Sequence, residues 1–491
     1  MENLKQKTIK GALAKICSQG ATFFLRVGSL MVMARLLEPR DFGLVGMVTA
    51  VIGVLNLFKD FGLSTASVQR TNVTEEQAAT LFWINVAVGG ALAMIAAAAA
   101  PVLATFYREP RLVPVTLVMA SAFLFNAAGV QHSARLQREM RFVPISMIEG
   151  LSLLVSVIVG IAMAKVGYGY WSLVVTGVLT PLLSTLSLWT YTRWIPTRPH
   201  RRSGIRSMMR FGGTVTLNGI VVYCAYNMEK VLLGRFLGAE TLGIYGRSYQ
   251  LISIPNENLN SAVGGVTFSA LSRVKDDPPR FRAYFLKAYS LLLALTIPTT
   301  TAFALFANEI IVVLLGQKWH ESAPIFRLLA PTVLVFALIN PLGWLLISLG
   351  KVGRSLKVAL VLAPVVMAGY LSGLRYGPTG VAAGYSIAMA LWTIPHMLWC
   401  LHGTPVSFGD LARTIVRPAA SSMIAAGAAL AVQLLLHSMA PLPRLVIGGL
   451  VLAGVYLLVL LLVMGQKAVY LDLISTLRKT APVTSGAAAS A

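Results

Sequence analysis

The sequence predicts an all-helical integral membrane protein with about fourteen transmembrane helices. Of its 491 residues, 56% are hydrophobic and only 12% are charged, and the mean hydropathy is +0.73. An ordinary soluble domain carries about 25% charged residues, so this chain lacks the charge to cover a soluble surface. The apolar runs are also continuous over about 20 residues, the length of a helix that crosses a bilayer, whereas barrel strands alternate. Soluble domains, disorder and a β-barrel are therefore excluded.

The individual helices are predicted from apolar windows bounded by charged residues, Gly or Pro. The windows near Ser253 and Val335 are the weakest, because the first holds many polar groups and the second has ragged ends. The predicted centres are Ala21, Ile52, Val88, Ala120, Val157, Val178, Val221, Ser253, Leu293, Val335, Val365, Met389, Ala425 and Leu457.

Lys and Arg predict the orientation, because cytoplasmic loops of membrane proteins carry an excess of both. With the N-terminus inside, the even-numbered connections face the cytoplasm, and they hold the basic clusters at 135–141, 193–206, 273–287 and 351–357. An even number of spans returns the C-terminus to the cytoplasm. We thus expect a multi-pass membrane protein with both termini in the cytoplasm. The spread of basic residues over many loops accounts for the net charge of +23 without nucleic-acid binding.

Signals of an enzyme or of a metal site are missing from the sequence. Cys17, Cys224 and Cys400 are far apart and lie in apolar runs, so neither a disulfide framework nor a metal site is predicted. The chain has no D-x-D pair for a sugar-nucleotide metal and no G-x-x-x-x-G-K-[ST] phosphate loop. We expect no enzymatic activity and no cofactor.

An internal repeat divides the chain. The segment ARLLEPRDFGLVG in the second span matches GRFLGAETLGIYG in the eighth at a constant offset of 200 residues, which pairs Gly43 with Gly243. The copies are six spans apart, so both halves enter the membrane in the same direction. Parallel repeats of this kind are typical of transporters that bind substrate between the halves. We therefore predict a six-helix bundle over 1–195, a basic linker over 196–206, a second bundle over 207–403, and a final helix pair with a tail over 404–491.

Polar residues at membrane depth give the candidate substrate site. A charged residue at mid-bilayer costs about 3 kcal/mol on insertion scales, so each one is a functional hypothesis. Lys15, Gln19 and Arg26 share one face of the first helix, although Lys15 is near enough to the helix start to reach the membrane surface. Tyr226, Asn227 and Lys230 lie close together on the seventh.

The eighth helix adds further polar groups around Pro255. Its Arg247 completes the predicted cationic cavity, whose members are Lys15, Gln19, Arg26, Tyr226, Asn227, Lys230 and Arg247. Glu229 and Glu257 are candidates for coupling transport to an ion. For both, a structural ion pair remains an equal or nearly equal alternative.

Several segments together resemble the polysaccharide-export branch of the multidrug/oligosaccharidyl-lipid/polysaccharide superfamily, the Wzx-type flippases. They read ARLLEPRDFGLVGM, FKDFGLSTASVQR, TLFWIN, LQREMRF, GYGYWSLV, ALSRVKDD and LLGQKWHESAPIFRLLAP, and the resemblance covers about residues 9–400. Two departures occur. Ser269 stands where similar members often have Pro, and Glu229 stands where they often have Asp.

The resemblance implies a V-shaped carrier of fourteen helices. By alternating access, it would move an undecaprenyl-diphosphate-linked oligosaccharide from the inner to the outer leaflet for exopolysaccharide, lipopolysaccharide or capsule assembly. Its partners would be that lipid-linked sugar, membrane lipid, a proton or sodium ion, and the polymerase and chain-length proteins of an export pathway. Three alternatives stay open: a multidrug or cation antiporter of the same superfamily, a membrane polysaccharide polymerase, and a scaffold that transports nothing.

Overall fold

Every regular element in the described part of the chain is helical, with no strand among those residues. The computed structural model describes residues 20–58, 74–199 and 206–467. Each of the fourteen predicted helix centres falls within a helix. By length and composition, nine helical stretches of the described residues could cross a membrane, and one of them, Gly353–Leu401, comprises two successive helices. The predicted fold class is confirmed.

The chain divides into two compact units. The first contains residues up to Gly246, with the short segments Leu315–Trp319 and Leu374–Pro378. The second contains Arg247–Leu314, His320–Gly373 and the residues from Thr379 onward. The four segments predicted from the repeat and the charge pattern stay a prediction.

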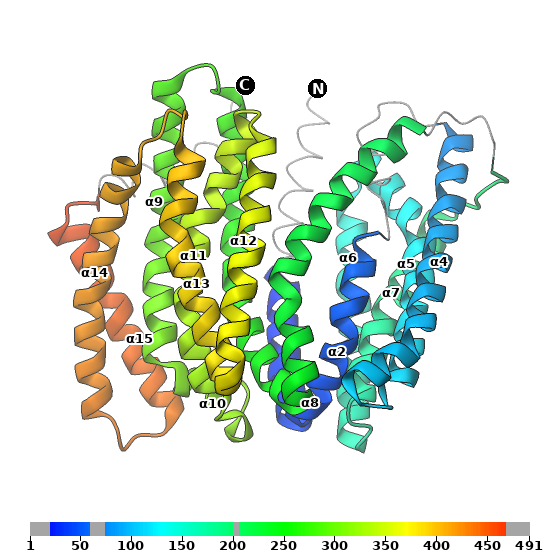
Figure 1. Cartoon of the computed structure of the whole chain (residues 1–491), viewed down its shortest axis with the longest axis horizontal. Helices are drawn as coiled ribbons and strands as arrows, with labels where there is room; N and C mark the ends of the chain where they lie inside the picture. The colour runs from blue at the N-terminus through cyan, green and yellow to red at the C-terminus, as the bar shows by residue number, and fades with distance from the viewer. Residues whose placement is uncertain (1–19, 59–73, 200–205, 468–491) are drawn as a thin grey trace, which may run out of the picture. The chain divides into compact units, whose positions relative to one another are not determined.

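In the first unit α4 packs antiparallel to α5, α6 packs antiparallel to α7, and α5 and α7 pack side by side in the same direction (Figure 1). Thr74 caps the start of α4, since its hydroxyl accepts a hydrogen bond from the Gln77 amide, and α6 ends at Gly167 in the left-handed region. The helices are 20–36, α2 (Pro39–Asn56), α4 (Glu75–Tyr107), α5 (Leu112–Arg138), α6 (Phe142–Val166), α7 (Trp171–Thr192) and the first part of α8 (Arg206–Arg273).

A break at Gly238 makes α8 two helices in succession. Its φ of 85° and ψ of 177° leave the helical region, and a residue with a side chain rarely adopts this φ. The break separates the predicted seventh span from the eighth, so the weakly predicted span near Ser253 is indeed helical.

The second unit is also a helical bundle, in which α9 packs against α11 and α14, and α14 against α15 (Figure 1). Its helices after α8 are α9 (Pro278–Leu305), α10 (Ala307–Leu314), α11 (Ser322–Ser348), α12 (Val352–Gly373), α13 (Gly377–Leu401), α14 (Phe408–Leu435) and α15 (Pro441–Leu458). A π-helical turn, Val459–Val463, continues α15.

A buried ion pair ties the final helices to the rest of the second unit. Glu309 of α10 is 2% exposed and receives a hydrogen-bonded salt bridge from Arg444 of α15 at 2.6 Å. The amide of Gln433 on α14 donates to the same carboxylate at 3.2 Å. One carboxylate therefore joins three helices, and removing either charge would leave its partner buried and uncompensated.

The two copies of the repeat pack against each other inside the first unit. A Cβ built on Gly43 of α2 would lie 1.6 Å from the carbonyl oxygen of Ala239, and one on Gly243 of α8 would lie 1.8 Å from that of Pro39. Both glycines and both carbonyl residues are related by the 200-residue offset. Such reciprocal contacts are what a two-fold axis between equivalent segments produces. The repeat read from the sequence is thus expressed as a symmetric, close helix contact.

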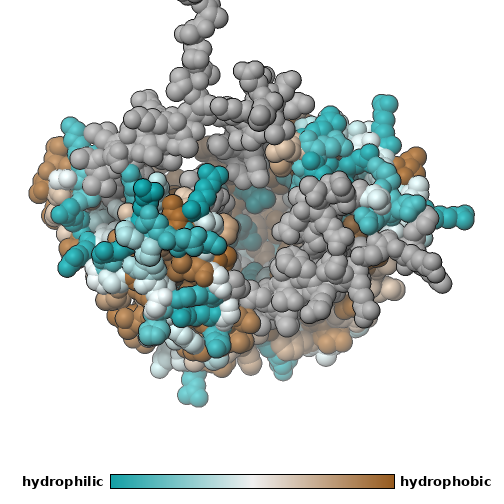
Figure 2. Space-filling model, turned by 90° about the horizontal axis from the view of Figure 1, so that it is seen from above, coloured by the Kyte–Doolittle hydropathy of each residue, from teal (hydrophilic) through white to brown (hydrophobic). Residues whose placement is uncertain are grey.

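The surface at the end of the molecule where α14 begins is rich in hydrophilic residues. Figure 2, which looks onto this end, shows them gathered over the described surface, with hydrophobic residues towards its margins. This is the distribution expected where helix ends meet water.

Candidate functional site

A row of polar side chains runs along the first part of α8 and contacts α2. The Tyr223 hydroxyl lies 3.4 Å from the carbonyl oxygens of Thr49 and Ala50, in the space that the missing side chain of Gly53 leaves. The Asn227 amide donates to the Tyr223 carbonyl at 3.0 Å, and Lys230 Nζ donates to Asn227 Oδ1 at 2.7 Å. The ammonium is therefore held in a fixed position by a neutral partner.

This row brings together two of the predicted cavity residues, Asn227 and Lys230, both half-buried. Tyr226 is next to them in the chain and is also half-buried. An ammonium carries three donors, and Asn227 accepts from one of them. The amide oxygen that accepts from the ammonium carries no formal charge, so this hydrogen bond positions the cation without forming an ion pair.

Glu229, a candidate coupling residue, is fully buried in the first unit. Its exposed fraction is 0%, and neither carboxylate oxygen has a hydrogen-bond partner among the described residues. Lys230 is adjacent and attracts the carboxylate electrostatically. Burial of a carboxylate without a hydrogen bond costs free energy, so such a group is a candidate for proton or cation binding.

A small cavity lies in the first unit beside the same part of α2. Its volume is about 210 Å³, and Thr49, Asn56 and Asn126 give it polar walls, while Phe123 and Val178 contribute apolar ones. Thr49 and Gly53, which contact Tyr223, also line it. Asn56 was not among the predicted site residues. Asn126 was missed because a single amide in a long apolar helix stands out only when its neighbours in space are known.

The other predicted site residues are more scattered. Lys15 and Gln19 lie outside the described residues. Arg26 is exposed on the helix 20–36 of the first unit. Arg247, which is half-buried, and Glu257, which is exposed, belong to the second unit. Among the described residues of the first unit, the members on α8 lie together, and the rest of the predicted cavity stays a prediction. No cluster of His, Cys, Asp and Glu with metal-site geometry occurs in the described ranges.

A family model described as "Polysaccharide biosynthesis protein" matches residues 32–324, more than half of the chain and the whole of the polar row. The chain belongs to this family. It is 27% identical to the lipopolysaccharide biosynthesis protein WzxC of Escherichia coli over 403 residues, which cover 80% of each chain. It is also 29% identical to the teichuronic acid biosynthesis protein TuaB of Bacillus subtilis, over 60% of this chain and 61% of that one.

Solved structures extend the fold assignment to both units. The lipid II flippase MurJ, in an inward closed conformation, matches 95% of this chain and 100% of its own with a TM-score of 0.73 and 14% identity. A multidrug resistance MATE transporter of the MOP superfamily, in an inward-facing conformation, matches 80% of this chain and 95% of its own with a TM-score of 0.63 and 13% identity. At these identities the likeness establishes the fold, which is the one expected from the sequence.

Proposed function

We propose that this polysaccharide biosynthesis protein is a flippase for a lipid-linked oligosaccharide. It would carry an undecaprenyl-diphosphate-linked repeat unit from the cytoplasmic to the outer leaflet by alternating access. The observation that carries the proposal is the half-buried Lys230, held by Asn227 on α8 in a chain of the polysaccharide biosynthesis family. The names of WzxC and TuaB, and the MurJ-like fold, support the same substrate class.

The chemistry of the site suits the two polar parts of such a substrate. Lys230 can donate charge-assisted hydrogen bonds to a diphosphate, and Arg26 and Arg247 are further candidates for this role. The amides of Asn56 and Asn126 can donate to and accept from sugar hydroxyls. The polyprenyl tail needs no polar path, since it stays in the bilayer while only the headgroup crosses.

The membrane potential favours this direction of transport. Outward movement of an anion gains about 2.3 kcal/mol per charge for each 100 mV, inside negative. Proton or sodium coupling through Glu229 or Glu257 would then serve mainly to return the empty carrier. The fully buried Glu229 is the better candidate. Binding of a proton or a cation would neutralise its carboxylate and so remove the free-energy cost of a buried charge.

The remaining parts of the proposal concern cellular context. The protein would act as a transporter without catalysis, in a bacterial inner membrane with both termini in the cytoplasm. Its partners would include the polymerase and chain-length proteins of the export pathway. The basic connections and the names of the relatives support this assignment.

The test is transport by the full chain in liposomes loaded with a fluorescent undecaprenyl-diphosphate oligosaccharide, read by accessibility of the sugar to a lectin or glycosidase. Lys230→Gln is expected to lower the initial rate at least about tenfold, whereas Lys165→Gln, an exposed lysine at the end of α6, leaves it unchanged. Lys230→Arg keeps the charge and should retain part of the rate.

Cells that lack the protein separate the alternatives. A flippase defect leaves complete lipid-linked units on the cytoplasmic side, while a polymerase defect leaves unpolymerised units outside. Drug hypersensitivity with normal polymer export would instead support an antiporter. Equal transport rates for wild type and Lys230→Gln would remove the site from the proposal, and absence of any sugar translocation by the wild-type protein would refute the function itself.

A further inference from the structure

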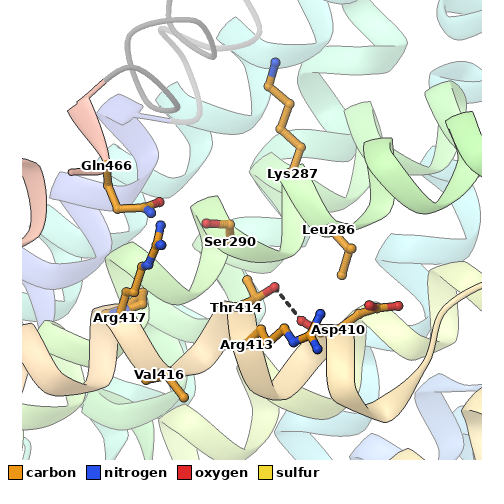
Figure 3. A pocket seen from close by; sticks show the side chains of 10 residues that line it. Leu286, Lys287, Ser290, Asp410, Arg413, Thr414, Val416, Arg417 and Gln466 are labelled. Carbon is orange, nitrogen blue, oxygen red and sulfur yellow. Dashed lines mark hydrogen bonds between the residues drawn. The ribbon is translucent and has the colours of Figure 1, made fainter. Parts of the chain in front are cut away.

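The second unit contains a large pocket that the proposed transport does not use. Its volume is about 980 Å³, and it lies between residues 286–290 of α9 and the first three turns of α14, with Gln466 completing the wall (Figure 3). Three of its ten lining residues are basic, namely Lys287, Arg413 and Arg417, and one is acidic, Asp410.

The acidic residue is already neutralised by a neighbour. Both Nε and Nη2 of Arg282 donate to the carboxylate of Asp410, the former at 2.8 Å, and Asp410 also accepts from the backbone amide of Ser407 at 3.0 Å. This arrangement joins α9 to the start of α14. Arg413 and Arg417 have no ion-pair partner among the residues that the structure describes. The pocket therefore keeps a net positive charge.

The two arginines form a pair on one face of α14. They are four residues apart, so they lie about 6 Å from each other along the helix axis. Both are exposed, and Figure 3 shows the Arg417 side chain extending towards Gln466. The figure shows the Arg413 side chain extending towards Asp410 instead, so the spacing of about 6 Å is that of the two backbone positions. Each guanidinium can donate two hydrogen bonds to the oxygens of a phosphate.

Apolar side chains connect the pocket to a surface suited to acyl chains. Val416 lines the pocket and is 62% exposed, and Met423, two turns further along α14, is 71% exposed. Leu286 and Pro418 add apolar wall. In a transmembrane helix, exposed apolar residues beyond the first turns face lipid. The pocket thus combines a basic end with an apolar exit along α14.

We propose that this pocket binds the phosphate of an anionic membrane lipid. Arg413 and Arg417 hold the phosphate, and the acyl chains lie along Val416 and the exposed face of α14. Basic pockets between transmembrane helices are suited to such headgroups. A soluble anion would bind to the basic residues but would make no contact with the apolar wall, whereas a lipid would contact both. The proposal does not depend on the transport function.

The experiment measures lipid binding to the purified full chain by native mass spectrometry. Phosphatidylglycerol is titrated against wild type, an Arg413→Gln/Arg417→Gln variant, and a Lys275→Gln/Arg375→Gln control that removes the same charge from exposed positions outside the pocket. We expect about 10- to 30-fold weaker binding to the pocket variant and unchanged binding to the control. Zwitterionic phosphatidylcholine should bind weakly and equally to all three.

Competition identifies the lipid that carries the phosphate. Displacement of phosphatidylglycerol by cardiolipin but not by undecaprenyl diphosphate supports the proposal, because it indicates a glycerophospholipid site. Displacement by undecaprenyl diphosphate alone would assign the pocket to the transported lipid and would overturn the proposal. Inorganic phosphate that competes as well as either lipid would overturn it, as would equal phosphatidylglycerol binding by wild type and the pocket variant. If the double variant does not fold, Arg417→Gln alone decides, with a loss of at least about threefold expected.

Discussion

The reciprocal contact between the two repeat copies predicts that Gly43 and Gly243 tolerate no side chain. Alanine at Gly43 would place Cβ 1.6 Å from the Ala239 carbonyl oxygen, and alanine at Gly243 would place it 1.8 Å from that of Pro39. Both obstacles are backbone atoms, so no change of rotamer can relieve the overlap. The two helices must move apart, and every contact along them weakens.

Two opposing effects set the size of the change. Alanine gains up to about 1 kcal/mol over glycine in helix propensity. Overpacking of a close contact costs typically about 1–3 kcal/mol, and more when the backbone has to move. With overlaps this large the steric cost should prevail, so we expect a net destabilisation of about 1–2 kcal/mol for each single substitution.

The assay is the apparent melting temperature of the detergent-solubilised protein, read as the monomer peak in size-exclusion chromatography after heating. Gly246→Ala is the matched control, because no atom lies within 4 Å of the point that its new Cβ would occupy, and the substitution should be neutral or slightly stabilising. The double variant should lose less than the sum of the single losses, since the first substitution already separates the helices. Equal melting temperatures for Gly43→Ala and Gly246→Ala, or additive losses, would refute the reasoning.

Other parts of the structure lead to three further predictions. Arg444→Met should destabilise the protein by about 3–5 kcal/mol, because it leaves the Glu309 carboxylate buried without its cation. The double variant Glu309→Gln/Arg444→Met should recover most of this loss in the same melting assay. Glu109 accepts hydrogen bonds from Arg111, and these bonds lower the pKa of its carboxyl below the usual 4.5. The ionised carboxylate therefore stabilises the folded protein above that pH, and this contribution is lost as the pH falls. Glu109→Gln should flatten the decline of the melting temperature in acid. Asn85→Leu should be neutral or stabilising, because both amide atoms are buried without a partner among the described residues; a marked loss of stability would indicate a bound polar molecule.

Hydrophobicity determined most of what the sequence could predict about the fold. A transmembrane helix must satisfy its own backbone hydrogen bonds, so a run of about 20 apolar residues has few alternatives to helix. Even the polar stretch around Ser253 is helical in the structure. The repeat was visible because glycines at a close helix contact cannot be replaced by residues with side chains, which keeps Gly43 and Gly243 at one offset.

The sites were predictable only in part, for a physical reason. Residues three apart on one helix lie on the same face, so the proximity of Asn227 and Lys230 to each other could be inferred from the sequence. A pocket formed by several helices depends on packing instead. Arg413 and Arg417 were visible as charges near a helix start, but their pocket also needs Lys287, more than a hundred residues earlier in the chain. Arg282 likewise neutralises Asp410 across a long separation, which composition alone could not reveal.

The hydrogen bond between Lys230 and Asn227 allows a test of whether the partner of Lys230 must be uncharged or must only fix the position of the ammonium. Asn227 accepts from the ammonium and donates to the Tyr223 carbonyl, so it fixes the cation without neutralising it. A carboxylate at the same position would also fix the cation but would compete with an incoming phosphate. Asn227→Asp should therefore preserve the fold and impair anionic substrate binding. Asn227→Leu removes both hydrogen bonds of the amide, as Asn227→Asp removes its donor, but it adds no negative charge and should impair binding less. The order of these two variants in a transport assay separates a charge requirement from a positional one.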